Sequence, residues 1–241
     1  SILIFKTDDY SFKDVPGTIN GVSSDGKYFL DCDENGYFSI INILNRNQIM
    51  NSNILNIKGL EVAKMFPKSH DVILLTSKGI VYYLSEMKTI KWKNNYGVIS
   101  LINSDCLISK QGNCFGFSGE SNLPNNSKII KSMLCKRDGN IIWEKAFADG
   151  ILKAISEKGQ YSIIDREKNN IILILGNNGQ KLSEYKYDKN WIIVSLLISE
   201  VRKYVILYLV ARKEDKIKII YLDLSGSLKY AFDIDGNYHY G

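Results

Sequence analysis

The feature of this sequence that most constrains its fold is a repeat of about forty residues, each copy of which holds four short apolar runs. The runs are rich in Ile, Val, Leu, Tyr and Phe, and clusters of Gly, Asn, Asp and Ser separate them. This alternation is typical of antiparallel strands joined by tight turns. We therefore expect an all-β protein, and four strands per repeat predict the sheets of a β-propeller.

Five such groups can be placed, and we label their strands a to d. The groups occupy residues 18–58, 59–96, 97–149, 150–189 and 190–233. The third is the longest, and we expect its extra length to form an irregular insertion from Lys110 to Lys128. That insertion would lie between a b strand at Cys106 to Ser109 and a c strand at Ile129 to Cys135.

The ends of the chain suggest how the ring closes. Two strand-like runs, Ile2 to Phe5 and Tyr10 to Val15, precede the first group. In propellers the last blade often combines strands from both chain ends. We predict a single domain over residues 1–241, with five clear blades and a partial sixth shared by the termini. Ile2 to Phe5 should pair or pack with the last blade; a sandwich of two packed sheets is the alternative fold.

The turn residues support this arrangement for a physical reason. Glycine supplies the positive φ that a tight hairpin needs. We predict hairpin turns at Asp25-Gly26, Asn35-Gly36, Asp138-Gly139 and Lys158-Gly159.

Two turn sequences resemble known propeller families. The string Asp138-Gly139-Asn140-Ile141-Ile142-Trp143-Glu144 resembles the c-to-d turn of PQQ-like repeat propellers, and Ser23 to Lys27 is similar to the a-to-b turn of WD-type and Tol-associated propellers. The resemblance implies a fold superfamily. The sequence lacks the WD dipeptide and the Gly-His signature of WD repeats, and no quinone-ligand motif maps onto it, so the resemblance implies no function.

Two features of the sequence could suggest a metal site, a calcium-loop-like segment and the four cysteines, but neither requires a metal. The segment Asp31 to Gly36 matches the opening of a calcium loop, but the twelfth position is Asn42 and the segment falls at a b-to-c hairpin. The four cysteines form no C-x-x-C pair, and His70 and His239 lie far from them in sequence, which disfavours zinc. We expect no metal and no cofactor. We expect free thiols by default, and a disulfide between Cys106 and Cys114 is the alternative.

Catalytic motifs are also weak in this sequence. A hydrolase needs a histidine that activates a nucleophile, and no nucleophile motif accompanies His70 or His239. Gly112, Gly116 and Gly119 do not join a strand to a helix, so they do not form a phosphate-binding loop. Paired carboxylates at the central channel stay open as an alternative.

Charge and hydropathy limit the partners. The formal net charge of +5 comes from scattered lysines with few arginines, so we expect no nucleic-acid partner. The longest apolar stretch, Trp191 to Ile198, is too short to span a bilayer as a helix. The chain begins at Ser1 inside an apolar run, which suggests a processed protein or an excised domain, and we expect an extracytoplasmic location.

Propellers bind ligands at the face formed by their d-to-a and b-to-c loops, where aromatic and Asn or Asp side chains make binding sites. The residues that we expect there are Asn95, Tyr96, Asp149, Tyr187, Asp188 and Trp191, together with Phe115 and Phe117 from the insertion. We predict a noncatalytic scaffold that binds a protein partner through this face. The alternative function is an enzyme that processes a small molecule or carbohydrate with carboxylates at the central channel.

Overall fold

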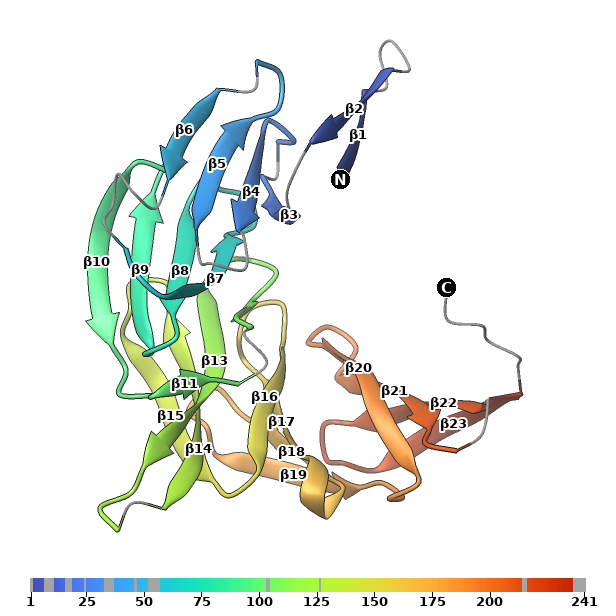
Figure 1. The fold of residues 1–241 in the computed structure, drawn as a ribbon. Helices are drawn as coiled ribbons and strands as arrows, with labels where there is room; N and C mark the ends of the chain where they lie inside the picture. The colour runs from blue at the N-terminus through green and yellow to red at the C-terminus, as the bar shows by residue number, and fades with distance from the viewer. Residues whose placement is uncertain are drawn as a thin grey trace. The chain divides into compact units, whose positions relative to one another are not determined.

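The computed structural model consists of β-strands and one short 3-10 helix (Figure 1). It describes residues 2–6, 11–15, 19–23, 25–32, 37–45, 47–51, 57–102, 105–125, 127–213 and 216–235. Two compact units make up the chain, residues 1–106 and residues 107–241, and each is described by itself. Within the described ranges, no helix has the length and apolar character needed to cross a membrane.

Unit 1 holds two four-stranded antiparallel sheets and a hairpin. The hairpin pairs β1 (Ile2–Lys6) with β2 (Ser11–Val15). The first sheet is β3 (Ile19–Val22), β4 (Tyr28–Cys32), β5 (Phe38–Asn42) and β6 (Gln48–Asn51). The second is β7 (Leu60–Met65), β8 (Val72–Thr76), β9 (Ile80–Ser85) and β10 (Thr89–Asn95), and the short strand β11 (Ser100–Leu101) follows. Leu30, Ile40, Leu74 and Leu84 belong to the apolar core that these two sheets share.

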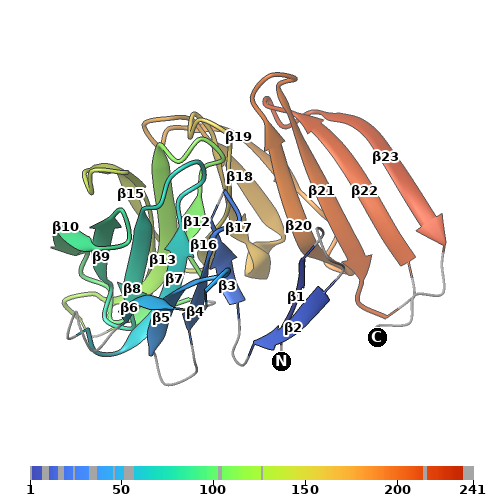
Figure 2. The ribbon, with the colours of Figure 1, turned by 90° about the horizontal axis from the view of Figure 1, so that it is seen from above.

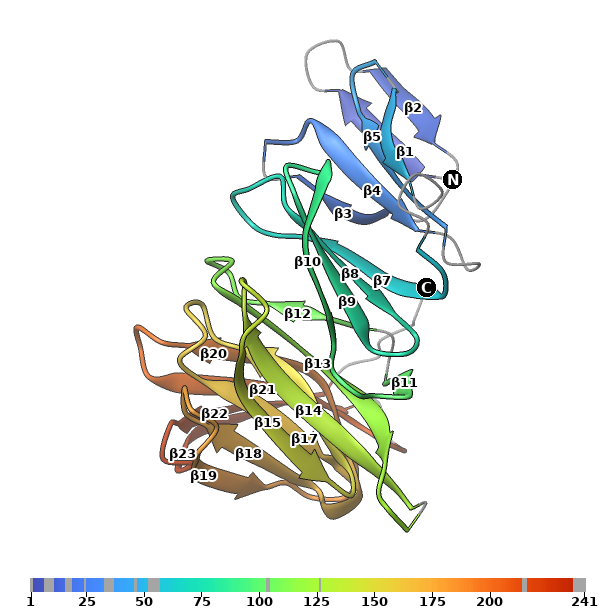
Figure 3. The ribbon, with the colours of Figure 1, turned by 90° about the vertical axis from the view of Figure 1, so that its left-hand side faces the viewer.

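Unit 2 holds three more antiparallel sheets. The first contains β12 (Leu107–Ile108), β13 (Cys114–Asn122), β14 (Lys128–Lys136) and β15 (Ile141–Phe147), of which β13 to β15 stand out in Figure 3. The next is β16 (Gly150–Ile155), β17 (Ser162–Arg166), β18 (Ile171–Leu175) and β19 (Lys181–Lys186), with the helix η1 (Glu167–Asn169) between β17 and β18. The last is β20 (Trp191–Ser199), β21 (Tyr204–Ala211), β22 (Lys216–Asp223) and β23 (Leu228–Asp235), which lie side by side with β23 at the edge (Figure 2).

The period-2 apolar pattern of the strands determines where each sheet packs. In the last sheet, Val205, Leu207 and Leu209 alternate with half-buried neighbours. They pack with Ile163, Ile172 and Ile174 of the preceding sheet in one core. Burial of an aliphatic side chain contributes roughly 1.5–3 kcal/mol, so contacts of this kind hold neighbouring sheets of unit 2 together.

Four strands per group are confirmed, with strand ends within a few residues of the predicted ones outside the third group. The turns at Gly26, Gly139 and Gly159 are confirmed as well: their φ angles are 69°, 88° and 82°. Each glycine N–H donates to a carbonyl three residues earlier, at 2.9 to 3.0 Å. The predicted turn at Asn35-Gly36 lies outside the described residues, as does most of the calcium-loop segment.

The irregular insertion predicted from Lys110 to Lys128 is wrong, because its central nine residues form strand β13, which pairs with β14 along its whole length. Glycine and serine disfavour strands in general, but here they permit close packing. A Cβ on Gly116 would lie 2.5 Å from Leu152 Cδ2 and 2.6 Å from the Met133 carbonyl oxygen. Ser118 Oγ lies 2.7 Å from Ser132 Oγ and accepts the Leu152 N–H at 2.8 Å. The extra length of the third group therefore extends β13 and β14.

The side chains of Cys106, Cys114 and Cys135 are described, and all three are buried thiols that form no disulfide. This confirms the default over the Cys106–Cys114 disulfide. Burial raises the pKa of the Cys114 thiol above its ordinary value. The thiol therefore stays protonated at neutral pH and acts as a small apolar side chain.

Candidate functional site

Hydrogen bonds connect four loops at one end of unit 2, which we call the loop face. It comprises Asp149, Arg166 to Asn170, Tyr187 to Asn190, and Arg212 and Lys213. Two of these segments join d strands to a strands, and the other two join b strands to c strands. This is the loop type that the sequence predicts for binding.

Asp149 holds the first two loops together. Its side chain is buried and accepts hydrogen bonds from Arg166 Nε at 2.9 Å and from Asn169 Nδ2 at 2.7 Å. A buried charge is stable only when it is paired and hydrogen-bonded, and both carboxylate oxygens of Asp149 have partners. Asp149 therefore fixes the η1 turn against the start of β16.

Tyr187 connects the next loop to the same sheet. Its backbone N–H donates to the Asn170 carbonyl at 2.9 Å, and its hydroxyl donates to Asp165 Oδ1 at 3.1 Å. Burial raises the pKa of the Asp165 carboxyl above its ordinary value, although the hydrogen bond from Tyr187 opposes the shift. Burial, with the charge of Asp165, also raises the pKa of the Tyr187 phenol.

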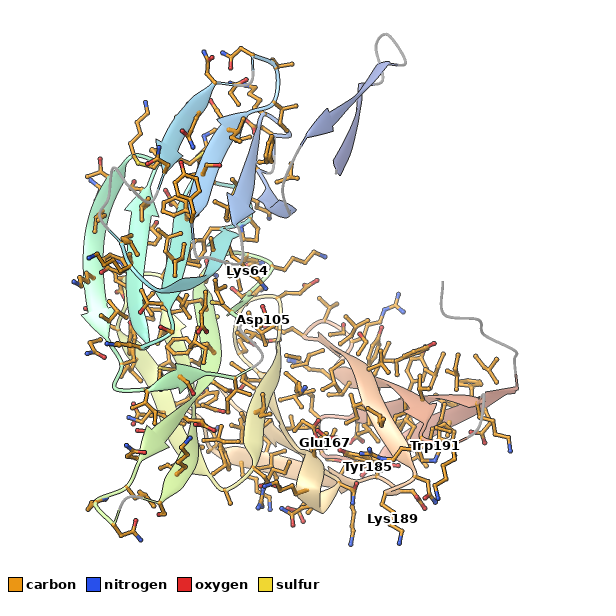
Figure 4. The ribbon with its side chains drawn as sticks, viewed as in Figure 1. Lys64, Asp105, Glu167, Tyr185, Lys189 and Trp191 are labelled. Carbon is orange, nitrogen blue, oxygen red and sulfur yellow. The ribbon has the colours of Figure 1, made fainter. Side chains whose placement is uncertain are left out.

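Arg212 joins the last two loops of the face. Its backbone N–H donates to the Asn190 carbonyl at 2.8 Å, and its Nε donates to the Lys189 carbonyl at 3.1 Å. Its terminal nitrogen lies 3.2 Å from the Glu167 carboxylate in η1. Glu167, Lys189 and Trp191 gather at this end of unit 2 in Figure 4. One guanidinium thus connects its own loop to two others.

A cavity of about 510 Å³ lies beside Arg212, between the starts of β20 and β22 and the end of β23. Trp191 forms one wall, and the ammonium of Lys218 lies 4.8 Å from the centre of its ring. Lys218 also pairs with Asp233 at 3.1 Å. The residues that line the cavity are Asn190, Trp191, Ala211, Arg212, Lys213, Lys216, Lys218 and Asp233.

Comparisons with known proteins identify the architecture. The β-propeller domain of Cps50 (Swd1) from Myceliophteria thermophila matches 97% of this chain over 80% of its own, with 11% identity and a TM-score of 0.60. A chain of the mitotic checkpoint complex matches 95% of this chain over 70% of its own, with 12% identity and a TM-score of 0.64. The chain has a β-propeller fold.

A third structure, of the eukaryotic initiation factor, matches 89% of this chain with 12% identity and a TM-score of 0.51. The propeller spans only 64% of that chain, which is less than two thirds. No family model and no curated protein sequence matches the propeller. The structural matches confirm the predicted fold class.

The propeller places the predicted site residues in three environments. Asp188 is exposed and caps its own loop by accepting the Asn190 N–H at 2.8 Å. Trp191 is half-buried and lines the cavity, whereas Asp149 and Tyr187 are buried in the hydrogen-bond network beneath. These four residues of unit 2 therefore lie at the loop face. Asp188 and Trp191 reach the surface, whereas Asp149 and Tyr187 are buried and hold the loops in place.

Asn95 and Tyr96 belong to a d-to-a loop in unit 1. Asn95 is exposed and accepts the Gly97 N–H at 2.9 Å. Tyr96 is buried, and its backbone N–H donates to the Gly79 carbonyl at 3.2 Å in the neighbouring b-to-c turn. The side chain of Asn95 is therefore accessible to solvent, whereas Tyr96 is a buried part of the loop.

Phe115 and Phe117 require a correction, because the loop in which the sequence placed them is a strand. Their side chains are 0% and 1% exposed in β13. Neither ring offers a surface to a partner. The Gly and Ser residues around them, which suggest a loop in sequence, are the residues that let β13 pack closely.

Sequence reasoning missed the cations around the cavity, namely Arg212, Lys213, Lys216 and Lys218. It treated the lysines as scattered along the chain. A signal was present, since Lys216 and Lys218 share one face of a strand by the period of two and follow a turn that holds Arg212 and Lys213. Within the part of the chain that the structure describes, no group of three or more His, Cys, Asp or Glu side chains is arranged to hold a metal ion.

Proposed function

We propose that this propeller is a noncatalytic scaffold that binds a protein partner through its d-to-a and b-to-c loops. The observation that carries the proposal is the loop face of unit 2. Its loops are held in place by Asp149, Tyr187 and Arg212, while Asp188, Lys213 and Trp191 are left at least partly accessible. A surface that is ordered before binding loses little conformational entropy when a partner docks.

The structural neighbours support a role in protein assembly in general. One of them is a chain within the crystal structure of the mitotic checkpoint complex. An identity of 12% is evidence for the fold alone. We therefore argue the class of partner and the contact residues from the geometry of this chain. That geometry favours the loop face, because its accessible residues are aromatic and charged types that are common in binding sites.

The alternative is an enzyme that uses carboxylates at the central channel. The two buried carboxylates at the loop face, Asp149 and Asp165, are both engaged by neighbouring side chains. A general acid or base must lie within hydrogen-bond reach of a substrate. Both oxygens of Asp149 and one oxygen of Asp165, which adjoins the loop face in β17, are hydrogen-bonded to Arg166, Asn169 and Tyr187, so these two groups support the loop face rather than a reaction.

Site-specific photo-cross-linking tests the proposal. A photoreactive phenylalanine analogue replaces exposed Asp188 in one variant and exposed Lys110 in another. Lys110 lies in an a-to-b turn of the same unit, so it is the matched control. In an extract of the cells that make the protein, position 188 should give a discrete cross-linked product that position 110 does not give.

The cross-linked protein is then purified and mixed with the unmodified propeller. A binary complex that forms with the parent and weakens with Asp188→Ala and Trp191→Ala supports the proposal. Equal cross-linking at both positions, or a complex that tolerates both substitutions, contradicts it.

A further inference from the structure

Most of the charged side chains that line the cavity beside Trp191 are cationic. Its cationic side chains are Arg212, Lys213, Lys216 and Lys218, and Asp233 is the one carboxylate among the described residues that line it. A volume of about 510 Å³ lies in the range of sites that bind small ligands or peptide side chains. The cavity therefore combines the size of a ligand site with an excess of positive charge.

The cations differ in how they are held. Lys218 is fixed between the Trp191 ring and Asp233, and Arg212 is fixed by Glu167 and the Lys189 carbonyl. These two side chains form an ordered wall. Lys213 and Lys216 also line the cavity, and both are exposed to solvent.

Trp191 provides the apolar part of the site. Its indole is half-buried, and it opens strand β20 directly after the exposed loop at Asp188 and Lys189. A flat aromatic wall suits the aliphatic stem of a side chain, and the surrounding cations suit a carboxylate at the end of that stem. Glutamate and aspartate have this combination of parts.

We propose that this cavity binds an acidic peptide segment of the protein partner, with a Glu or Asp side chain along the Trp191 ring and its carboxylate near Lys213 and Lys216. This inference rests on the proposed function, since the cavity adjoins the loop face. It adds the chemistry of the partner. Electrostatic attraction makes the binding salt-dependent, because screening weakens interactions between exposed charges.

Two carboxylates of the chain itself, Glu214 and Asp215, lie between Lys213 and Lys216 in sequence and outside the described residues. They bear on the proposal because they carry the same charge as the acidic peptide. The double variant Glu214→Gln and Asp215→Asn should bind an acidic peptide at least as tightly as the parent. Weaker binding of the acidic peptide by this variant would overturn the proposal.

The main test uses fluorescein-labelled ten-residue peptides of alternating Glu and Gly, alternating Gln and Gly, and alternating Lys and Gly. Fluorescence anisotropy should show at least tenfold tighter binding of the Glu peptide than of the other two. The affinity should fall as NaCl rises from about 50 to about 300 mM. Unlabelled Glu peptide should change the intrinsic tryptophan emission, and Trp191→Phe should abolish that change.

The matched variants are Lys213→Gln with Lys216→Gln in the cavity, and Lys181→Gln as an exposed control on β19. The first pair should weaken binding of the Glu peptide at least tenfold, and the control should leave it unchanged. Free glutarate and inorganic phosphate serve as competitors. Full competition at equal concentration would identify a small-anion site and overturn the peptide assignment.

Equal binding of the Glu and Gln peptides, or no effect of the paired lysine substitutions, would also overturn the inference. These outcomes leave the proposed function standing if position 188 still cross-links a partner. If position 188 gives no cross-link but the Glu peptide still binds, the scaffold function is contradicted while the anion-binding site stands.

Discussion

The carboxylate of Glu200 accepts a hydrogen bond from the hydroxyl of Ser156 in the neighbouring blade, at an Oε1–Oγ distance of 2.5 Å. The same oxygen accepts the backbone N–H groups of Lys158 at 2.7 Å and Gln160 at 3.3 Å. Glu200 follows β20 and Ser156 follows β16, so both residues lie in a-to-b turns. A buried carboxylate thus joins corresponding turns of consecutive sheets within unit 2.

Replacement of Glu200 by Ala should lower the free energy of unfolding by about 2–3 kcal/mol, because hydrogen bonds to a charged acceptor are lost near buried donors. Urea denaturation followed by circular dichroism measures the change. The matched control is Glu157→Ala, which removes a surface ion pair to Lys110 at 3.2 Å and should cost less than about 1 kcal/mol. Equal losses in the two variants would show that Glu200 does not connect the turns.

Replacement of Phe115 or Phe117 by Ala should each destabilise the protein by about 3–5 kcal/mol, since both rings are buried and their removal leaves a cavity. Thermal and urea unfolding provide the measurement. Leu182→Ala, at an exposed position of β19, is the control and should change stability by less than about 1 kcal/mol. A small effect at both phenylalanines would restore the exposed loop that the sequence suggested.

Asp165 should make the protein less stable as pH rises. Its folded pKa lies above its ordinary value of 3.8, so the folded state holds this proton more tightly than the unfolded state does. The stabilisation is complete below about pH 4 and is lost as pH rises through the folded pKa. Asp165→Asn keeps an oxygen for the Tyr187 hydroxyl but does not titrate.

The difference in stability between Asp165→Asn and the parent should therefore shift in favour of the variant from pH 4 to pH 8. Urea titrations at several pH values measure this difference. A difference that shifts in favour of the parent over the same range would mean that the folded pKa is lowered.

The last sheet has an apolar face that is exposed. Directly paired residues of a sheet point to the same side, and one such row runs from Leu197 on β20 to Tyr230 on β23. These two side chains are 61% and 66% exposed, and Phe232 on the same face is 52% exposed. The hairpin of β1 and β2 is a two-stranded sheet, which is marginal by itself.

We therefore predict that deletion of residues 1–15 lowers the melting temperature by several degrees, with Tyr230→Ser as a comparison on the exposed face. If the hairpin covers this face, Tyr230→Ser should destabilise the full chain and have little effect in the deleted chain. Unchanged melting after deletion would count against closure by the N-terminal strands.

The strand pattern was predictable from sequence because it depends on local rules. Turns such as Asp138-Gly139 and Lys158-Gly159 need a positive φ, and glycine identifies them directly. The strand at Phe115 was not predictable, since Gly116 and Ser118 are favoured there by contacts with Leu152, a residue distant in sequence. Local propensity gives no information about such a contact.

The candidate site was predictable in part for the same reason. The d-to-a position of Trp191 follows from the repeat, and so does the exposure of Asp188. The cavity depends on the order of β20, β21, β22 and β23 in one sheet and on the side chains that reach across it, which bring Lys218 onto Trp191 and next to Asp233. The burial of Tyr187 depends on its hydroxyl contact with Asp165, which sequence spacing does not reveal.

The most direct test of the binding function is calorimetry of the partner captured at position 188, titrated into the purified propeller and two variants. The loop-face variant combines Asp188→Ala, Trp191→Ala and Lys213→Gln, and the control combines Lys110→Ala with Lys181→Gln in the same unit. We predict at least tenfold weaker binding for the loop-face variant and unchanged binding for the control, with both proteins shown to be folded by circular dichroism at the temperature of the titration. Equal affinity of the two variants for the partner would contradict it.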